Sequence, residues 1–451
     1  MFESLSPVAE TGKLYLDFDS FFASAEQHFN PVLQGKPVGV VPLDVRHTGC
    51  IAISREAKAL GVPSGASVTD ARTIVPEMIF VVARPDVYVR LHHRIIKVIE
   101  TCLPIEKVRS IDEVVCDLVS SEWAQGASLG EKIKRALSEN FSEALTCSIG
   151  LAPTELLAKI AAEMNKPDGL TVIGMDQLPG AIAHIPLNNI PGISKGMGSR
   201  LDKAGVHDLN GLWNLGSKQM RALWGSVEGE RFWNALHGCA FERPDTQKRM
   251  FGHSRMLPLD WRTPDKVQEC ARQLALGAAR RLRRTQLKAT KLTLSVRGGG
   301  YRTDISRRSD DKRWSSEAVF IAMRDDRSCL RHLGQAFERY QREVEFIPRS
   351  VSVVLHGLID AEPLQNDLFD DPRVGDCHAR FMQRQQRDER LSGVLDAIRS
   401  MHGPAAANYG MNTDMPGGYL GAKIAFGRIP DLDDFNENQS EDCETRFCSV
   451  A

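Results

Sequence analysis

The chain has 451 residues, of which 42% are hydrophobic and 25% are charged, and this balance excludes a largely disordered chain. Its length is too great for one ordinary hydrophobic core and predicts about three or four domains. The formal net charge of −1 excludes a uniformly basic nucleic-acid binder.

The ten cysteines are scattered, without a Cys-x-x-Cys pair or a Cys/His cluster of zinc spacing. We therefore interpret them as small buried residues of a protein in a reducing cytoplasm. No apolar run reaches the ~18 residues that a transmembrane helix requires. Residues 1–12 lack the basic start and the long apolar stretch of a signal peptide. These features predict a cytoplasmic protein that does not enter a membrane.

Charge is unevenly distributed along the chain. Between residues 280 and 313, twelve Lys and Arg residues face three Asp residues, which gives this segment a net charge of +9. After residue 430, seven acidic residues face a single arginine. We expect a polyanion-binding surface in the first segment and a solvated, partly disordered end in the second.

The first 175 residues predict an α+β domain. In chain order, we expect a strand, a helix, two short strands, two helices, a hairpin, a helix, a strand and a helix, at 13–19, 20–30, 37–41, 50–54, 55–60, 87–102, 107–119, 129–145, 147–151 and 154–164. This order fits helices packed on one face of a mostly antiparallel sheet.

The remainder of the chain predicts a different organisation. Residues 181–240 predict short helices broken by glycine and proline. A second α+β unit follows, with strands at 250–258, 289–297, 314–319 and 349–357 and helices at 265–284 and 326–343. A further helical stretch is expected at 380–400, before a loop at 403–421 that is rich in Gly, Asn and Met.

Four carboxylates in two separate segments are candidate ligands for metal ions. Asp17 lies on an apolar strand, where an unpaired carboxylate is costly to bury, and Asp19 points to the same face. Asp112 and Glu113 form a doublet in the turn of the predicted hairpin, which could aim both side chains at one site. Converging carboxylates need cations, and their hard oxygen atoms select Mg²⁺ or Mn²⁺. A strand-end cap and a solvated turn remain the structural alternatives, because spacing alone does not show convergence.

The motifs around these carboxylates resemble those of Y-family DNA polymerases. They are residues 16–26, 30–31 and 35–41 for the opening motif, 110–113 for the second, 148–150, 157–162 and 166–169 for the third, and 190–193 for the helix-hairpin-helix entry of the thumb. The resemblance covers residues 13–240 and extends more weakly to residue 358.

The resemblance implies that two Mg²⁺ ions, or Mn²⁺ ions, activate a primer 3′-hydroxyl and stabilise the leaving pyrophosphate. Asp17 and Asp112 would bridge both ions, and Glu113 would bind the ion at the primer oxygen. Phe18 would contribute its backbone carbonyl. Asp19 matches a position that varies in the family, so we do not expect it to be a ligand.

The resemblance also implies a site for the incoming nucleotide. Phe22 matches the steric gate, the ring that lies against the sugar and rejects a 2′-hydroxyl, and Lys166 matches the lysine that contacts the triphosphate. This chain has Arg55 and Lys58 where the family commonly carries Tyr and Arg. Both residues are cationic and one helical turn apart, so we expect phosphate contacts with an altered geometry.

The implied fold is α+β, in the form of a right-hand polymerase with a separate DNA-binding domain. The expected parts are a ferredoxin-like palm at 1–20 and 87–175, small fingers at 21–86, a helical thumb at 176–244, an α+β little finger at 248–358 and a C-terminal tail at 359–451.

Primer-template DNA and a dNTP are the implied partners. Backbone groups at Gly192 and Ile193 would approach a phosphate. Basic residues of the little finger would contact the duplex without reading its sequence, and they are Arg280, Arg281, Arg283, Arg284, Lys288 and Arg297. Gln365, Leu368 and Phe369 match the bacterial sliding-clamp pentapeptide. The long tail favours a mutagenesis accessory protein as a further partner.

The expected activity is error-prone translesion DNA synthesis in DNA damage tolerance and the SOS response. The alternatives are a catalytically silent scaffold of a mutagenesis complex, a palm-type nucleotidyl cyclase and a DNA-binding module. The intact carboxylates argue against the scaffold and the module, and the thumb and the basic domain argue against the cyclase. The choice between a polymerase IV type and a polymerase V catalytic subunit stays open, as does the preferred lesion.

Overall fold

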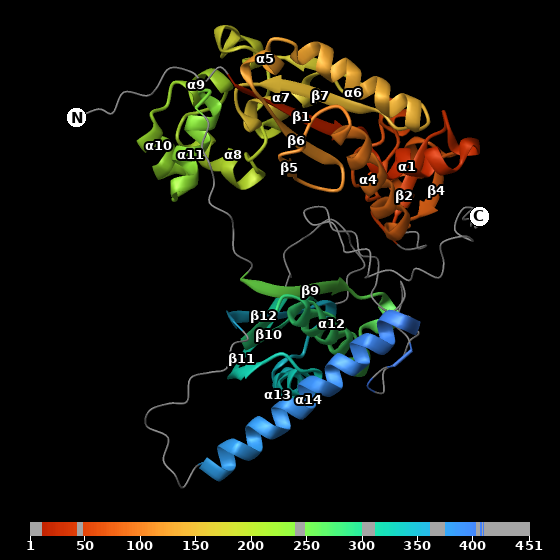
Figure 1. Ribbon diagram of the computed structural model, residues 1–451, viewed down its shortest axis with the longest axis vertical. Coiled ribbons are helices and arrows are strands. Elements are labelled where there is room, and N and C mark those ends of the chain that lie inside the picture. Colours follow the sequence, from red (N-terminus) through yellow and green to blue (C-terminus); the bar gives the residue numbers. More distant parts are fainter. Residues whose placement is uncertain are drawn as a thin grey trace. The chain divides into compact units, whose positions relative to one another are not determined.

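The computed structural model describes residues 11–42, 48–239, 249–299, 312–360 and 375–402, together with residues 406, 407 and 409 (Figure 1). The side chains of the last helix are described from residue 383 onward. The described residues form two compact units, one within Met1–Pro244 and the other within Asp245–Ala422. Within the described residues, no helix is long and apolar enough to cross a membrane.

The first unit is built on a five-stranded sheet with β1 at its centre. The strand order is β5-β6-β1-β7-β8, with β1 (Gly12–Phe18), β5 (Lys107–Val108), β6 (Glu113–Leu118), β7 (Cys147–Ala152) and β8 (Leu170–Val172). β1 runs antiparallel to both β6 and β7. The predicted strand at the N-terminus, the hairpin and the strand near residue 150 are therefore confirmed.

Helices cover both faces of this sheet, so the prediction of helices on a single face is wrong. Leu14 and Leu16 pack in one core with α4 (Pro85–Glu100) and α6 (Gly126–Asn140). Tyr15 points to the opposite face and packs in another core with α7 (Glu155–Met164). The unbroken apolar run of β1 is the sequence feature that corresponds to burial on both faces.

The close approach of α7 to β7 depends on Gly150. A Cβ atom at this position would overlap with the backbone oxygen of Ala158 and the backbone nitrogen of Ala162. The glycine therefore allows the helix to lie directly on the strand.

A three-stranded sheet of order β3-β2-β4 forms the next part of the first unit. Its strands are β2 (Val38–Val41), β3 (Ala52–Ile53) and β4 (Ile79–Val82), and its helices are α1 (Phe21–Phe29), α2 (Arg55–Ala59) and α3 (Val68–Ile74), with a short 3-10 helix η1 (Pro31–Leu33). Ser54 caps α2 through its hydroxyl, which accepts the Ala57 N–H.

Short helices complete the first unit, and those between residues 181 and 240 confirm the prediction from the sequence. They are α5 (Ser120–Trp123), η2 (Met175–Gln177), η3 (Gly180–Ile182), η4 (Leu187–Asn189), α8 (Lys195–Lys203), α9 (Leu209–Trp213), α10 (Ser217–Trp224) and α11 (Val227–Leu236). Apolar residues of α8 to α11 share a core with α7. This shared core fixes the helical region onto the main sheet.

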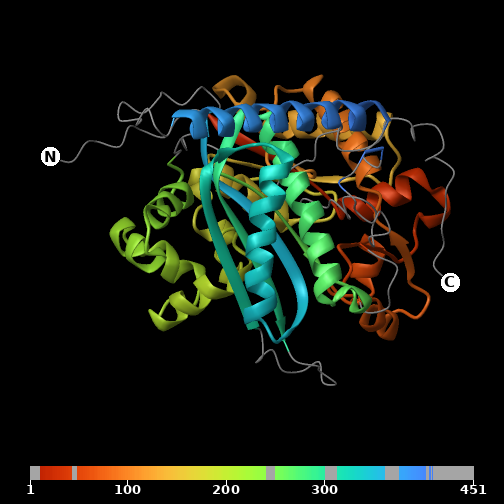
Figure 2. The same ribbon diagram turned by 90° about the horizontal axis from the view of Figure 1, so that it is seen from below.

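The second unit is a four-stranded antiparallel sheet covered by helices on one face. The order is β11-β10-β12-β9, with β9 (Met250–Met256), β10 (Leu287–Gly299), β11 (Lys312–Met323) and β12 (Ile347–Asp360). Figure 2 shows α12 (Pro264–Arg284, green) and α13 (Asp326–Glu343, cyan) lying over the sheet. Along β10, Leu292, Leu294 and Val296 are buried while the residues between them are partly exposed. This alternation leaves the other sheet face open.

A short 3-10 helix, η5 (Leu259–Trp261), precedes α12. A last helix, α14 (Gly375–His402), packs against this unit through polar side chains. Gln385 donates to the carbonyl oxygen of Ala322 at 2.5 Å, and the Ser392 hydroxyl accepts the Asp326 N–H at 3.0 Å. The helical stretch expected at 380–400 is therefore confirmed, and it is a packed part of the second unit.

Candidate active site

Strand register brings the first and second carboxylate motifs together. Asp17 on β1 lies opposite Glu113 on β6 and opposite Ser148 on β7. The backbone N–H of Phe18 donates to the carbonyl oxygen of Asp112 at 2.9 Å. Asp112 therefore sits at the tip of the β5–β6 hairpin, beside the end of β1.

Asp17 is a buried carboxylate with one cationic partner. Its Oδ1 lies 2.7 Å from the Nζ of Lys166, which also pairs with Glu163 at 2.7 Å. Burial raises the pKa of Asp17 to about 7 despite the opposing effect of Lys166. The positive charge of Lys166 therefore does not fully offset the cost of burying the Asp17 carboxylate.

Asp112 and Glu113 share the hydroxyl of Ser110 but have different electrostatic surroundings. Ser110 Oγ donates to Asp112 Oδ1 at 2.5 Å and approaches Glu113 Oε2 at 3.3 Å. Burial raises the pKa of Asp112. Burial acts in the same direction on Glu113, but an ion pair with Lys159 outweighs it and lowers the pKa of Glu113. Glu113 is thus held as a carboxylate by the protein itself.

Three hard carboxylates from β1 and the β5–β6 hairpin fit divalent cations by their donor chemistry. Across the part of the chain that the structure describes, no three His, Cys, Asp or Glu side chains already form a closed metal-binding group. Here Lys166 contacts Asp17, Ser110 contacts Asp112 and Lys159 contacts Glu113. The raised pKa values of Asp17 and Asp112 fit residues whose charge a cation would neutralise.

A cavity of about 260 Å³ adjoins the carboxylates. Its walls come from β1, α1, the β3–α2 region and the loop after α7, and the residues that line it are Asp17, Phe18, Ser20, Phe21, Phe22, Ile51, Ala52, Ile53, Lys58, Ser64, Gly65, Asp112 and Lys166. The predicted nucleotide residues Phe22, Lys58 and Lys166 therefore meet in one cavity with Asp17 and Asp112.

Phe22 forms one wall of this cavity and is packed from behind by Tyr88. The ring centroids are 4.8 Å apart. The Tyr88 hydroxyl donates to Glu26 at 2.7 Å, and Arg84 binds both oxygens of the same carboxylate at 3.0 and 2.6 Å. A buried polar cluster thus fixes the ring that supports Phe22.

Arg55 lies outside the lining of the cavity, although the sequence places it beside Lys58 on α2. Its Nη1 donates to the Thr146 hydroxyl at 3.1 Å. Asp19 is also occupied within the protein, since its carboxylate accepts from Thr146 Oγ1, Ser148 Oγ and the Asp168 N–H, each at 2.8 Å. Neutral donors therefore occupy both oxygens of the Asp19 carboxylate.

Sequence reasoning did not assign roles to Ser110, Thr146 or Lys159. Lys159 lies within a motif that was recognised, and its Nζ also lies 3.2 Å from the Tyr15 hydroxyl. Lys159 lies on the face of α7 that packs on β1, and a charged residue on such a face was the feature that could have marked it as functional. The partner Glu113 is 46 residues away, so only the fold identifies the pair.

Gly192 and Ile193 form the turn that leads into α8. Gly192 has a φ of +92°, which favours glycine, and Ile193 is buried in the core that includes α7. The Ile193 N–H donates to the carbonyl oxygen of Ile190 at 3.0 Å. This hydrogen bond closes a tight turn directly before α8.

The basic residues of the second unit do not share one environment. Arg284 and Arg297 are exposed, and Arg281 donates to the carbonyl oxygens of Gly277 and Gly252. Arg280 lies 4.0 Å from Asp396 of α14, and Lys288 lies 3.7 Å from Glu389. Acidic residues of α14 therefore offset part of the basic segment.

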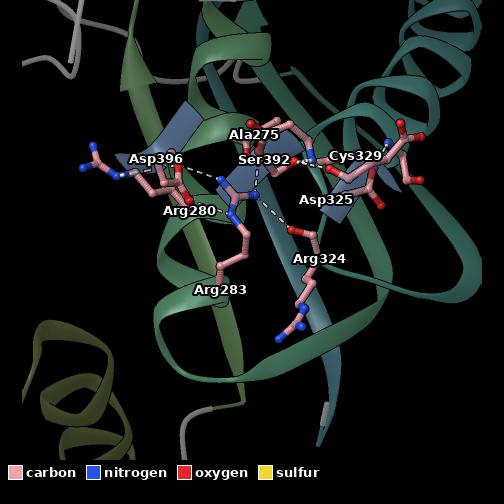
Figure 3. A network of polar contacts seen from close by, with 12 residues as sticks. Ala275, Arg280, Arg283, Arg324, Asp325, Cys329, Ser392 and Asp396 are labelled. Carbon is pink, nitrogen blue, oxygen red and sulfur yellow. Dashed lines mark hydrogen bonds and ion pairs between the residues drawn. The ribbon is translucent and has the colours of Figure 1, made fainter. Parts of the chain in front are cut away.

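Arg283 is a packed residue of the second unit rather than an exposed contact for DNA. Its guanidinium donates to both oxygens of Asp396 at 2.7 and 2.9 Å, to Asp326 at 2.7 Å and to the carbonyl oxygen of Arg324 at 2.9 Å (Figure 3). Its side chain is 11% exposed. The count of basic residues could not reveal this, because Asp396 is 113 residues away.

Comparison with known proteins identifies the family of this chain. Residues 16–163 match the impB/mucB/samB family, and residues 248–368 match the C-terminal domain of the same family. DNA polymerase IV of Moorella thermoacetica is 30% identical over 406 residues, which are 86% of this chain and 93% of the relative. The chain belongs to the Y-family of DNA polymerases.

Further relatives and solved structures agree with this membership. DNA polymerase IV 1 of Bacillus subtilis is 28% identical over 64% of this Y-family chain and 70% of its own length. A Y-family DNA polymerase chimera, Dbh-Dpo4(243-245)-Dbh, is similar in fold with a TM-score of 0.64 and 22% identity, over 77% of this chain and 99% of the chimera. The expected mixed fold of a Y-family polymerase is thereby confirmed.

Proposed function

We propose that the chain adds deoxynucleotides from dNTPs to a primer 3′-hydroxyl on damaged and undamaged templates. The observation that carries this proposal is the cavity in which Asp17, Asp112, Lys58 and Lys166 meet beside Phe22. Acidic and cationic groups on its walls suit a substrate that brings both divalent cations and a triphosphate. The alternative of a nucleotidyl cyclase is set aside by the membership of the Y-family.

Asp17, Asp112 and Glu113 would hold two Mg²⁺ ions, with the backbone carbonyl of Phe18 as a further ligand. When bound, such ions lower the pKa of the attacking hydroxyl and neutralise the charge of the leaving pyrophosphate. Lys166 and Lys58 would contact the triphosphate, and the Phe22 ring would lie against the sugar. Lys159 keeps Glu113 ionised, so this residue remains a carboxylate at neutral pH.

Primer extension with Mg²⁺ tests the proposal against that of a silent scaffold. We expect the wild-type chain to extend primers, EDTA to stop extension, and the double substitution Asp112→Ala with Glu113→Ala to abolish it. DNA affinity should change little, since it rests on basic residues elsewhere. Extension at a near-normal rate by the double variant, or none by the wild type, would refute the assignment.

We further propose a sliding clamp as partner, through Gln365, Leu368 and Phe369, which lie outside the described residues. A polar anchor followed by two apolar side chains suits a shallow apolar pocket. Changing the three residues to Ala should abolish the stimulation of synthesis by a clamp and spare synthesis without one. A parallel loss of both activities would assign the segment to the fold. We also propose a mutagenesis accessory protein as a partner of the C-terminal tail at 359–451.

A further inference from the structure

Asp19 is the centre of a hydrogen-bond network beside the proposed nucleotide site. The residue is 4% exposed, and its two carboxylate oxygens accept from the hydroxyls of Thr146 and Ser148 and from the backbone N–H of Asp168. All three distances are 2.8 Å. These donors come from two segments, the start of β7 and the loop after α7, so the carboxylate that follows β1 ties both of them to its own position.

One branch of the network reaches helix α2. A threonine hydroxyl can donate one hydrogen bond while accepting others. Thr146 uses both capacities, because it donates to Asp19 and accepts from Arg55 Nη1 at 3.1 Å. Arg55 begins the helix whose Lys58 lines the cavity. The guanidinium therefore connects the cationic helix to Asp19.

The other branch reaches the loop that carries Lys166. Asp168 has a φ of 58°, a left-handed conformation that non-glycine residues adopt infrequently. Its N–H is held by Asp19, and its carboxylate is held by Lys134 at 2.7 Å. Two residues earlier, Lys166 extends to Asp17 at 2.7 Å. The anchors on Asp168 therefore define where the Lys166 backbone lies.

We propose that Asp19 is a positioning residue for the triphosphate of the incoming nucleotide. It joins Arg55 on α2 to the Lys166 loop, so the two lysines that line the cavity, Lys58 and Lys166, are set in place before the nucleotide arrives. The inference rests on the proposed function, since it requires a nucleoside triphosphate in this cavity. An ordered loop spares the nucleotide the entropy cost of ordering it, so Asp19 strengthens nucleotide binding rather than the chemical step.

The test measures dNTP affinity on a dideoxy-terminated primer, where binding occurs without chemistry, alongside KM and kcat on an ordinary primer. We expect Asp19→Ala to weaken dNTP binding and raise KM roughly tenfold, the effect of releasing about one ordered residue, with kcat nearly unchanged. Asp19→Asn keeps one acceptor for the Asp168 N–H and should recover most of the affinity. Ser24→Ala is the matched control, because its hydroxyl donates to the backbone oxygen of Asp19 at 2.6 Å and not to its carboxylate.

Lys166→Ala provides the decisive background. If Asp19 acts in part through Lys166, adding Asp19→Ala to Lys166→Ala weakens dNTP binding by a smaller factor than Asp19→Ala does alone, and the residual factor belongs to the α2 branch. Effects that multiply, or a loss of thermal stability with unchanged affinity and KM, overturn the inference. Thr146→Val, which removes a partly buried hydroxyl at nearly constant shape, should weaken dNTP binding in part. It repeats the test if Asp19→Ala does not fold, and unchanged affinity in this folded variant overturns the inference. A wild-type chain that binds dNTP but never extends a primer instead refutes the proposed function.

Discussion

Removing the Arg283 guanidinium should destabilise the second unit while leaving DNA binding by the folded chain largely intact. Arg283→Met preserves much of the side-chain volume but deletes four hydrogen bonds, to Asp396, Asp326 and the carbonyl oxygen of Arg324. Asp326 is fully buried, and its remaining cation, Arg399, lies 3.8 Å away. Burial already raises the pKa of Asp326 with Arg283 present. Breaking a buried pair on one side costs about 3–5 kcal/mol, and we expect a loss in that range.

The assay is urea unfolding of the full chain, with hydrogen exchange to assign the transition to the second unit, and DNA affinity measured over a series of salt concentrations. Arg297→Met is the matched control, because Arg297 is an exposed residue on β10 of the same unit. The control should lose little stability and should flatten the salt dependence of binding. The reverse result, in which Arg283→Met keeps its stability and loses salt-dependent affinity, would refute the structural role of Arg283.

Three further predictions concern the first unit. Tyr88→Leu removes the ring that packs behind Phe22. The lost aromatic pair is worth about 0.5–1.5 kcal/mol, so ribonucleotide insertion should rise roughly threefold to tenfold. Unchanged discrimination between dNTP and rNTP would mean that other residues hold Phe22. Gly150→Ala forces a methyl group into the backbone of α7. It should lower the free energy of unfolding, measured in urea, by about 1–3 kcal/mol and remove much of the activity. An unchanged free energy of unfolding would show that the helix can shift. Burial lowers the pKa of His92 to about 4, so the unfolded chain takes up a proton that the folded chain excludes as pH falls from 6.5 toward 4. Stability should therefore fall by up to about 3 kcal/mol over this window, and His92→Gln should lack that component when the two unfolding curves are subtracted.

The elements of the fold were predictable where pattern and local chemistry coincide. The helix expected at 265–284 is observed at Pro264–Arg284, because its start is marked by proline and its apolar spacing is regular. The hairpin was also predictable, since a polar turn around Asp112 and Glu113 directly precedes the apolar run at 114–116. The helix layer on the second face of the main sheet was not, because an unbroken apolar strand does not say which element covers each face.

Side-chain contacts between residues far apart in the sequence could not be predicted. Arg55 contacts Thr146 across 91 residues, and Arg283 contacts Asp396 across 113. Both arginines looked like solvent-facing or phosphate-facing cations in the sequence. Only the tertiary fold identifies the residues that bind them, so local charge could not separate Arg283 from the exposed Arg297.

The four carboxylates near the cavity differ by their partners and not by their type. Neutral donors satisfy Asp19 on both oxygens, and Lys159 satisfies Glu113. Asp17 and Asp112 are different, since burial raises both pKa values even with Lys166 nearby. A deficit of positive charge is therefore concentrated on the two residues that line the cavity. Divalent cations that enter with a triphosphate would correct this deficit where the reacting oxygens must meet.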